Sequence, residues 1–444
     1  MLADPHPVFP FTAPARSSVR LPGSKSITNR SMMLAALAGG GTTLERALFS
    51  EDTLIMAESL RRMGFQVHED AAREEIHIGA RQTSGFSDSA ELFAGLAGTA
   101  ARFLTALCCA SPKGRYRIDG VPQMRKRPMK SLLDALSALG ARIQSADGFL
   151  PLEIEARGLS GGEVEIDATS SSQLLSALLM IAPLARGPVR IRLTDAGYRR
   201  EYVSMSLRMM EQFGQPAAAV TGDGLLVEPP GGVSYRSPGP RYLVEPDASA
   251  ASYFLALPVV TKGWIQLPGM PADSLQGDAA FVAKLAMIGA KIERTNDGAR
   301  CSFETGARGN AIQENFHAIS DTFLTLAAIA PLLDGVTRIT GIAHTRKQET
   351  DRVAGMAREL RKLGQHVLEE HDSLEIHPRP LAAGIEIETY HDHRFAMSFA
   401  ILGCHDLHGD GRPWLSIRDP GCCAKTFPRF FEVLERVRAE SSAN

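Results

Sequence analysis

The sequence predicts an α/β (α+β) protein that contains six copies of one βαβαββ module, grouped as two similar lobes. Two observations support this prediction. An amphipathic segment that ends in glycine recurs at a spacing of 74 to 76 residues, and a strongly apolar segment of helix length accompanies it in each unit. Because this period, with two different helices per unit, exceeds the usual solenoid repeat, we interpret each unit as a βαβαββ module.

The amphipathic segments carry apolar residues at positions i, i+3, i+4 and i+7, a spacing that lines one face of a helix. A glycine in the C′ position, where the backbone turns left-handed, ends each of the first five helices. These glycines are Gly64, Gly140, Gly214, Gly289 and Gly364. A sixth segment, FFEVLERV, starts at Phe430, and short strand-like runs such as FQVHE and AKIER follow several of the helices.

The second helix of each module is apolar on nearly all sides, which is typical of a helix buried at the centre of a domain. The six segments read RSMMLAALAGG, TAARFLTALCCA, SSQLLSALLMIAPLA, SAASYFLALPVV, DTFLTLAAIAPLL and HRFAMSFAILGC. Stretches rich in proline and glycine, before Gly23 and over 234–247, are the best candidates for domain boundaries. We therefore predict one lobe over 22–242, with repeats 1–3, and a second over 1–21 plus 243–444, with repeats 4–6 and a cleft between the lobes.

The composition narrows the class of protein. With 444 residues and 44% hydrophobic content the chain can bury large cores, and its net charge of −2 argues against nucleic acid as a partner. The six cysteines form no C-x-x-C pair, which favours reduced thiols in a cytoplasmic protein. The N-terminus lacks a signal-peptide pattern and no apolar run reaches about 18 residues, so we expect no membrane association. We also expect a monomer.

Each apolar helix begins with small, hydroxylic or basic residues, and the first such cluster is LPGSKSITNR. Small residues leave backbone N–H groups open at a helix N-terminus, an arrangement that favours anions. Lys25 and Arg30 add positive charge and Ser26 adds a hydroxyl, although an N-cap with solvated charges explains the cluster equally well. The run G-S-K-S resembles part of a P-loop, but the G-x-x-x-x-G-K-[ST] spacing is absent, which argues against a nucleotide triphosphatase.

Three further clusters follow in the first half of the chain. Gly98 in GLAGTAARF allows a ligand to approach the backbone closely. Arg127, one of four cations in QMRKRPMKS, precedes a proline that restricts its backbone, although a solvated basic face is the usual explanation of such a run. Successive hydroxyls in DATSSSQLL suit phosphate oxygens, and capping explains only one of them. This last group contains Ser170, Ser171, Ser172 and Gln173, and it is followed by Arg199, Arg200 and Tyr202.

The second half of the chain repeats this pattern and adds acids at the helix starts. Its candidates are Asp321, Glu349, Arg352, Asp392, His393, Arg394 and Lys425. An aspartate before an apolar helix is also a common N-cap, and this alternative stays open for Asp321. A metal site at His391 and His393 is disfavoured, because their i, i+2 spacing comes without a third ligand nearby. Helix N-termini combined with distributed cations predict a site for two multiply charged anionic ligands.

These motifs resemble the EPSP synthase (3-phosphoshikimate 1-carboxyvinyltransferase) family of enolpyruvyl transferases over essentially the whole chain. The resemblance rests on LPGSKSITNR, GLAGTAARF, RKRPMKSLLDALSALGA, SSSQLLSALLMIAPLA, VEPDASAASYFLA, QETDRVAGMARELRKLG, YHDHRFAMSFA and DPGCCAKTFPRFFEVLERV, in this order. It implies the two-lobed enolpyruvyl transferase fold, also described as an inside-out α/β barrel, in which buried parallel helices fill each lobe. It further implies transfer of the enolpyruvyl group of phosphoenolpyruvate to shikimate 3-phosphate in aromatic amino acid biosynthesis, with no metal and no organic cofactor.

The resemblance also implies roles for individual residues. Those expected to bind shikimate 3-phosphate are Lys25, Ser26, Arg30, Ser171, Ser172, Gln173, Tyr202, Asp321 and Gln348. Those expected to bind phosphoenolpyruvate are Lys25, Gly98, Arg127, Gln173, Arg352, Arg394 and Lys425. The expected proton-transfer residues are Lys25, Asp321, Glu349 and His393.

The sequence departs from the family pattern at three positions. The family usually has Asn where Leu96 and His344 stand, and Lys where Gln348 stands. Two alternatives therefore stay open. The protein is a paralogue that acts on another shikimate-like or cyclitol acceptor, or it is a non-catalytic ligand-binding relative. A transferase for UDP-sugars is disfavoured, because that family carries Lys-Asn where Lys25 and Ser26 stand.

Overall fold

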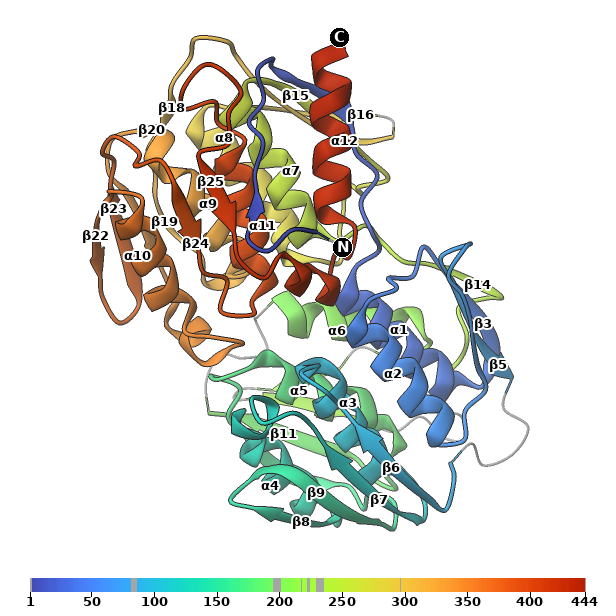
Figure 1. The fold of residues 1–444 in the computed structure, drawn as a ribbon. Coiled ribbons are helices and arrows are strands. Elements are labelled where there is room, and N and C mark those ends of the chain that lie inside the picture. The colour runs from blue at the N-terminus through green and yellow to red at the C-terminus, as the bar shows by residue number, and fades with distance from the viewer. Residues whose placement is uncertain are drawn as a thin grey trace. The chain divides into compact units, whose positions relative to one another are not determined.

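The computed structural model describes residues 2–80, 86–194, 201–216, 218–221, 224–228, 235–295 and 297–443. The chain divides into two compact units, which are coloured along the chain in Figure 1. The N-terminal unit is Gly23–Val244, and the C-terminal unit consists of Met1–Pro22 and Glu245–Asn444. The predicted closure of two lobes on a shared cleft stays a prediction.

The second and third modules of the N-terminal unit show the predicted βαβαββ order. The second module contains β6 (Ser89–Phe93), α3 (Gly98–Ala110), β7 (Gly114–Asp119), α4 (Lys130–Ala138), β8 (Arg142–Ala146) and β9 (Phe149–Ala156). The third contains β10 (Gly162–Ile166), α5 (Ser172–Ile181), β11 (Val189–Leu193), α6 (Glu201–Gln212), β12 (Ala219–Thr221) and β13 (Gly224–Val227). In each sheet the first two strands are parallel and the last two pair antiparallel. Helices α3 and α5 each form the crossover connection that two parallel strands need.

The first module takes its parallel edge strand from far along the chain. It contains α1 (Lys25–Ala38), β3 (Gly40–Glu45), α2 (Glu51–Arg62), β4 (Val67–Asp70) and β5 (Glu75–Ala80). The strand β14 (Arg241–Leu243) pairs in parallel with β3 and gives this sheet the same strand order as the other two. In Figure 1 this strand lies beside the blue strand β3.

The C-terminal unit repeats the arrangement in two modules, and its third module departs from the predicted βαβαββ order because no strand follows α12 among the described residues. The first contains β2 (Ala15–Ser18), α7 (Ala248–Thr261), β15 (Gly263–Pro268), α8 (Phe281–Ile288), β16 (Lys291–Thr295) and β17 (Gly298–Phe303). The second contains β19 (Gln313–Asn315), α9 (Phe323–Ile329), β21 (Thr337–Thr340), α10 (Arg352–Lys362), β22 (His366–Glu369) and β23 (Ser373–His377). The third contains β24 (Ile385–Ile387), α11 (His393–Gly403), β25 (Leu415–Ile417) and α12 (Phe430–Ala443), and β1 (His6–Pro7) closes its sheet. A short extra parallel pair joins β18 (Gly309–Asn310), between the first two modules, to β20 (Leu333–Asp334), which lies between α9 and β21.

The apolar helices form the cores, as the sequence predicts. Every residue of α3, α9 and α11 is buried, and α1 is buried from Ile27 to Leu37. Helices α7, α9 and α11 pack together in the C-terminal unit, where Figure 1 shows them side by side. Helix α11 begins with His393 and Arg394, and α7 carries Ser249 and Ser252 in its first turns, whereas α9 is apolar apart from Thr325.

The predicted glycine stops are confirmed. All five C′ glycines have positive φ, between 81° at Gly214 and 108° at Gly289. Residues with a side chain rarely adopt this left-handed backbone conformation, whereas glycine does so at little cost in free energy and therefore ends the amphipathic helices. All six cysteines are free thiols, and five of them are buried. Among the described residues, no helix is both long and apolar enough to cross a membrane.

Candidate active site

Two aspartates cap the helices of the C-terminal unit that begin with predicted site residues. Asp351 is the N-cap of α10 and accepts a hydrogen bond from the backbone N–H of Ala354, at 2.9 Å. Asp392 is the N-cap of α11 and accepts one from the N–H of Arg394, at 3.0 Å. Short polar side chains satisfy the open N–H groups of a helix start and so fix where it begins. These caps place Arg352 and His393 at the first positions of their helices.

Two buried arginines and two aspartates form one ion-pair network. Arg352 donates from Nε to Asp392 at 2.7 Å and from Nη1 to Asp321 at 3.0 Å. Arg394 donates from Nη2 to the other oxygen of Asp321 at 2.6 Å. Asp321 does not act as the N-cap of α9, whose N-cap is Thr322. The carboxylate of Asp321 therefore lies between two guanidinium groups, and the N-cap alternative for this residue is wrong.

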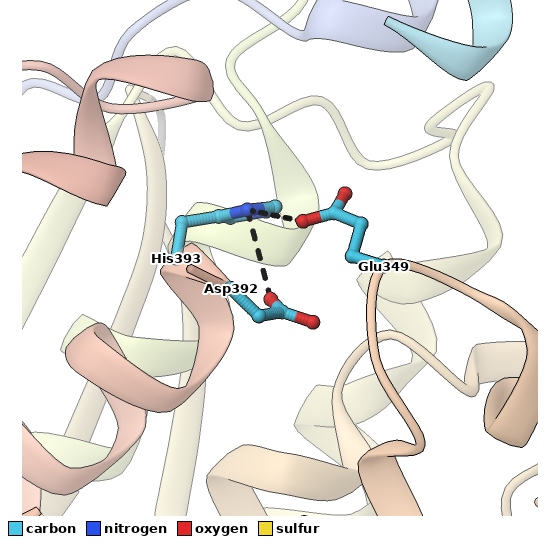
Figure 2. A group of neighbouring side chains, drawn as sticks. All are labelled: Glu349, Asp392 and His393. Carbon is cyan, nitrogen blue, oxygen red and sulfur yellow. Dashed lines mark ion pairs between the residues drawn. The ribbon is translucent and has the colours of Figure 1, made fainter. Parts of the chain in front are cut away.

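Glu349 lies at the centre of a second group in the same unit. Its Oε1 is 2.8 Å from the Nζ of Lys425, in the 3-10 helix η8 (Pro420–Lys425), and 3.9 Å from Nη2 of Arg352. Its Oε2 is 3.3 Å from Nδ1 of His393, which also lies 3.7 Å from Asp392 (Figure 2). The structure thus brings together the predicted residues of this unit from four separate segments of the chain.

The charges around Glu349 decide its protonation state. Burial opposes its charge, but the Lys425 ammonium, followed by His393 and Arg352, outweighs this and holds the pKa of Glu349 well below its usual range. Burial lowers the pKa of His393, although Glu349 pulls it upward. At neutral pH these shifts favour an ionised Glu349 beside a neutral imidazole.

A metal ion does not suit this group, although one atom each of Glu349, Asp392 and His393 lies within 4.8 Å of the others. Both oxygens of Asp392 accept hydrogen bonds, from Arg352 and from the N–H of Arg394. Oε1 of Glu349 faces Lys425. A divalent cation at this place would have to displace these positively charged partners and would be repelled by them.

Asp278, in the 3-10 helix η4 (Gly277–Ala280), is a residue that the sequence did not indicate. Its side chain is buried and accepts a hydrogen bond from Ser249. Burial and the nearby charge of Asp321 raise the pKa of Asp278 to about 7, against the opposing effects of Arg394 and Ser249. A second carboxyl group, protonated in mildly acidic solution, therefore lies near Asp321.

In the N-terminal unit, Lys25 pairs with a buried aspartate. Its Nζ is 3.2 Å from Asp52 in α2. Ser24 caps α1, and the glycine before it is required, because a Cβ at Gly23 would lie 1.9 Å from the carbonyl oxygen of Arg46. Asp52 was missed from the sequence, since an acid in the first turn of an amphipathic helix is an ordinary feature of such helices.

Arg30 is buried and works inside the N-terminal unit. It donates to Oγ of Ser206 at 2.8 Å and of Ser176 at 3.3 Å, and to the carbonyl oxygens of Ser26 and Tyr202 at 3.0 and 3.3 Å. Burial lowers its pKa to about 10, with a smaller opposing effect from Tyr202. This guanidinium fixes the backbone around Ser26 and Tyr202, two of the predicted binding residues.

The start of α3 gathers two arginines around a glycine. A Cβ at Gly98 would lie 2.4 Å from Nη1 of Arg127 and 2.8 Å from Nη1 of Arg102. Arg102 donates to Oε1 of Gln173 at 2.7 Å, and burial, followed by the charge of Arg127, lowers its pKa well below the usual range. Two adjacent guanidinium groups create a local positive potential that favours an anion.

The remaining predicted residues lie as follows. Ser171 is the N-cap of α5 and accepts from the N–H of Gln173 at 3.3 Å, so Ser172 occupies the first turn of this helix. Gln348 accepts from Arg352 through its side-chain oxygen, and His344 lies 2.8 Å from Oγ of Ser320. Arg199 and Arg200 lie outside the described residues. The predicted residues of the C-terminal unit thus lie together, and those of the N-terminal unit lie at or just before the starts of α1, α3, α4, α5 and α6.

Comparison with known proteins identifies the family. A family model of EPSP synthase (3-phosphoshikimate 1-carboxyvinyltransferase) matches residues 12–434. The chain belongs to the EPSP synthase family. It is 58% identical to the 3-phosphoshikimate 1-carboxyvinyltransferase of Opitutus terrae, with 100% of each chain covered. It is 40% identical to the chloroplastic 3-phosphoshikimate 1-carboxyvinyltransferase 1 of Nicotiana tabacum, over 94% of this chain and 82% of that one.

Solved structures agree with this assignment to the EPSP synthase family. The EPSP synthase of Acinetobacter baumannii superposes with a TM-score of 0.79 at 25% identity, covering 97% of each chain. The enolpyruvyl transferase NikO of Streptomyces tendae shares the fold, with a TM-score of 0.75 at 17% identity over 97% of this chain and 96% of that one. The fold class and the family resemblance inferred from the motifs are therefore confirmed.

Replacing Asp278 by asparagine should change how stability depends on pH. A carboxyl whose pKa is raised to about 7 binds a proton in the folded state between about pH 4 and 7, where the unfolded state has already lost it. Stability of the wild type therefore falls as pH rises through this window, whereas asparagine does not titrate. We expect the melting temperature of Asp278→Asn, relative to the wild type, to rise between pH 4 and pH 8. Asp134→Asn, at an exposed aspartate paired with Lys130, is the control, and a pH-independent difference for Asp278→Asn contradicts the assignment.

Proposed function

We propose that this protein transfers the carboxyvinyl (enolpyruvyl) group of phosphoenolpyruvate to the 5-hydroxyl of shikimate 3-phosphate, forming EPSP and phosphate. The reaction belongs to the shikimate pathway of aromatic amino acid biosynthesis. The observation that carries the proposal is the buried group of Arg352, Arg394 and Lys425 around Asp321 and Glu349, in a chain that belongs to the EPSP synthase family. The name shared by its curated relatives supports the substrates.

Phosphoenolpyruvate carries a carboxylate and a phosphate, which need several cations in a site that excludes water. We assign its binding to Arg352, Arg394 and Lys425 in the C-terminal unit and to Lys25, Gly98, Arg127 and Gln173 in the N-terminal unit. In the free protein the first three cations are held by carboxylates at 2.6 to 3.0 Å. A bound trianion can replace these partners with charge-assisted hydrogen bonds of its own.

The acceptor needs groups that hold a phosphate and orient hydroxyls. Ser26, Ser171, Ser172, Gln173 and Tyr202 offer hydroxyls and an amide at helix starts, where open N–H groups attract a phosphate. Lys25 and Arg30 add positive charge on α1, the helix that carries Ser26. In the C-terminal unit, Asp321 and Gln348 are assigned to the acceptor. Because Gln348 accepts a hydrogen bond from Arg352, this residue connects the two substrate sets.

The chemistry requires two proton movements. The acceptor hydroxyl loses its proton as its oxygen bonds to C2 of phosphoenolpyruvate, while the methylene carbon gains a proton. The tetrahedral adduct then expels phosphate, and the methyl group returns a proton as the double bond re-forms. We assign removal of the hydroxyl proton to Asp321 and proton exchange at the methylene carbon to Glu349 and Lys25, with His393 beside Glu349. A positioned acid or base of this kind contributes roughly 10²–10⁴-fold.

The state of Glu349 depends on ligand binding. In the free protein Lys425 at 2.8 Å favours its ionised form. When an anionic ligand takes up the charge of Lys425 and Arg352, the burial of Glu349 favours its protonated form instead. Substrate binding thus supplies the acid that the reaction needs. All steps are proton transfers and additions or eliminations, so the proposal involves no metal and no organic cofactor.

We also propose that the protein works as a monomer in the cytoplasm. Six free thiols are typical of a reducing compartment, which supports this location.

The direct test of the reaction is phosphate release from phosphoenolpyruvate in the presence of shikimate 3-phosphate. We expect turnover only when both substrates are present, and no phosphate when shikimate replaces its 3-phosphate. Turnover with another cyclitol but not with shikimate 3-phosphate supports the paralogue. Binding of both substrates without release supports a non-catalytic relative, and either result contradicts the proposal.

Replacing Gly98 by alanine should weaken phosphoenolpyruvate binding selectively. The new Cβ would lie 2.4 Å from Nη1 of Arg127 and must displace that guanidinium. We expect KM for phosphoenolpyruvate to rise about tenfold to a hundredfold, because small misplacements of a binding group have effects of that size. KM for shikimate 3-phosphate should change less than about threefold, as steady-state kinetics can show. Gly187→Ala is the matched control, since its nearest atom is 3.4 Å away, and equal effects of both variants exclude the assignment.

Replacing Glu349 by glutamine should slow the chemical step. The amide keeps the size of the side chain but cannot transfer a proton, so kcat should fall about 10²- to 10⁴-fold. KM for shikimate 3-phosphate should stay within about threefold of the wild type. Glu370→Gln, at an exposed glutamate paired with Arg338, controls for loss of charge. A Glu349→Gln enzyme with kcat within threefold of the wild type removes Glu349 from the proton-transfer residues.

A further inference from the structure

One face of α10 contacts the segment 388–395 along two helical turns. Arg352, Gly355 and Glu359 occupy positions i, i+3 and i+7, which lie on the same side of a helix. Arg352 pairs with Asp392, as described above. Gly355 lies against two aromatic rings, because a Cβ there would be 2.6 Å from Cζ of Phe395 and 3.4 Å from Cε2 of Tyr390. The helix and the segment therefore meet closely at the first two of these positions.

Glu359 supplies the third contact, and it is a charged residue with no exposed surface. Its Oε2 accepts a hydrogen bond from the backbone N–H of Glu388 at 3.0 Å, and its Oε1 accepts one from the hydroxyl of Tyr390 at 2.5 Å. Lys362, one turn further along α10, forms an ion pair with it. A buried carboxylate is costly unless its oxygens are satisfied, and here both are.

The residues that Glu359 holds have an unusual backbone. Tyr390 and His391 have φ values of 55° and 57°, so two successive residues other than glycine adopt the left-handed conformation. Such conformations persist only where the surrounding structure fixes them. Asp392, His393 and Arg394 follow immediately, so the path of this turn decides where their side chains lie.

We propose that Glu359 is a positioning residue for the reaction: its carboxylate fixes the turn at 388–391 and thereby places Asp392, His393 and Arg394 against Arg352, Glu349 and Asp321. This inference rests on the proposed function, in which Arg394 binds phosphoenolpyruvate and His393 lies beside the proton-transfer residue Glu349. Glu359 itself touches none of the groups assigned to substrate.

The test compares Glu359→Ala with Glu359→Gln. Alanine removes both hydrogen bonds, whereas the glutamine amide can accept from the N–H of Glu388 and donate to the Tyr390 hydroxyl. We expect kcat/KM for phosphoenolpyruvate to fall about tenfold to a hundredfold in Glu359→Ala and to recover to within about threefold of the wild type in Glu359→Gln. Tyr390→Phe, which removes one of the two bonds, should give an intermediate loss.

Hydrogen exchange separates a positioning role from a general loss of stability. In Glu359→Ala the amides of 388–395 should exchange at least tenfold faster, while those of β15 in the same unit stay within about threefold of the wild type. Leu360→Ala is the matched control, because it removes a buried side chain from the same helix without touching the 388–391 turn hydrogen bonds. If Leu360→Ala, at an equal loss of melting temperature, lowers kcat/KM as much as Glu359→Ala does, or if exchange at 388–395 is unchanged, the proposal is wrong. An inactive wild type overturns the proposed reaction instead, and the exchange experiment still reports on the turn.

Discussion

The pairing of Arg352 with Asp321 and Asp392 is the interaction on which the candidate site of the C-terminal unit depends. Its guanidinium is almost fully buried and joins the start of α10 to the loop before α9 and to the cap of α11. Removing one partner of a buried ion pair commonly costs about 3–5 kcal/mol, because the other charge is left unpaired. The carboxylate of Asp321, which lies between Arg352 and Arg394, also offsets the repulsion between the two guanidinium groups, so the cations are already in place before an anion arrives.

This network also explains why acids and bases coexist at one place with different protonation states. Glu349 is ionised because the positive charges of Lys425 and its neighbours outweigh the effect of burial on its pKa. The pKa of Asp278 is raised instead, because burial and the negative charge of Asp321 both favour its protonated form. His393 is neutral because it is buried. The chemistry therefore depends less on the residue types than on which charge is nearest to each, and a ligand that changes those charges changes the site.

The features predicted from the sequence are those encoded locally. Helix periodicity, the stops at Gly64 or Gly364 and the clusters at helix starts all lie within a few residues of each other along the chain, and the family motifs named the fold. The contacts of Asp52, Asp278 and Glu359 were not predictable in this way, because each depends on a partner brought near only by folding. An acid in an amphipathic helix is commonly solvated, and nothing in its neighbours along the chain distinguishes Glu359 from such a residue.

Three edge strands, β14, β2 and β1, pair with strands that are far away along the chain, and this constrains the order in which the sheets can form during synthesis. The sheet of the first module lacks its parallel edge until β14 has left the ribosome, after which all three sheets of the N-terminal unit can close. The strands β2 and β1 are made first, yet their partners are β15 and β25. These two N-terminal strands therefore stay unpaired until their partners, hundreds of residues later in the chain, have been synthesised. During that time their backbone N–H groups are open to chaperones or to pairing with the wrong sheet edge.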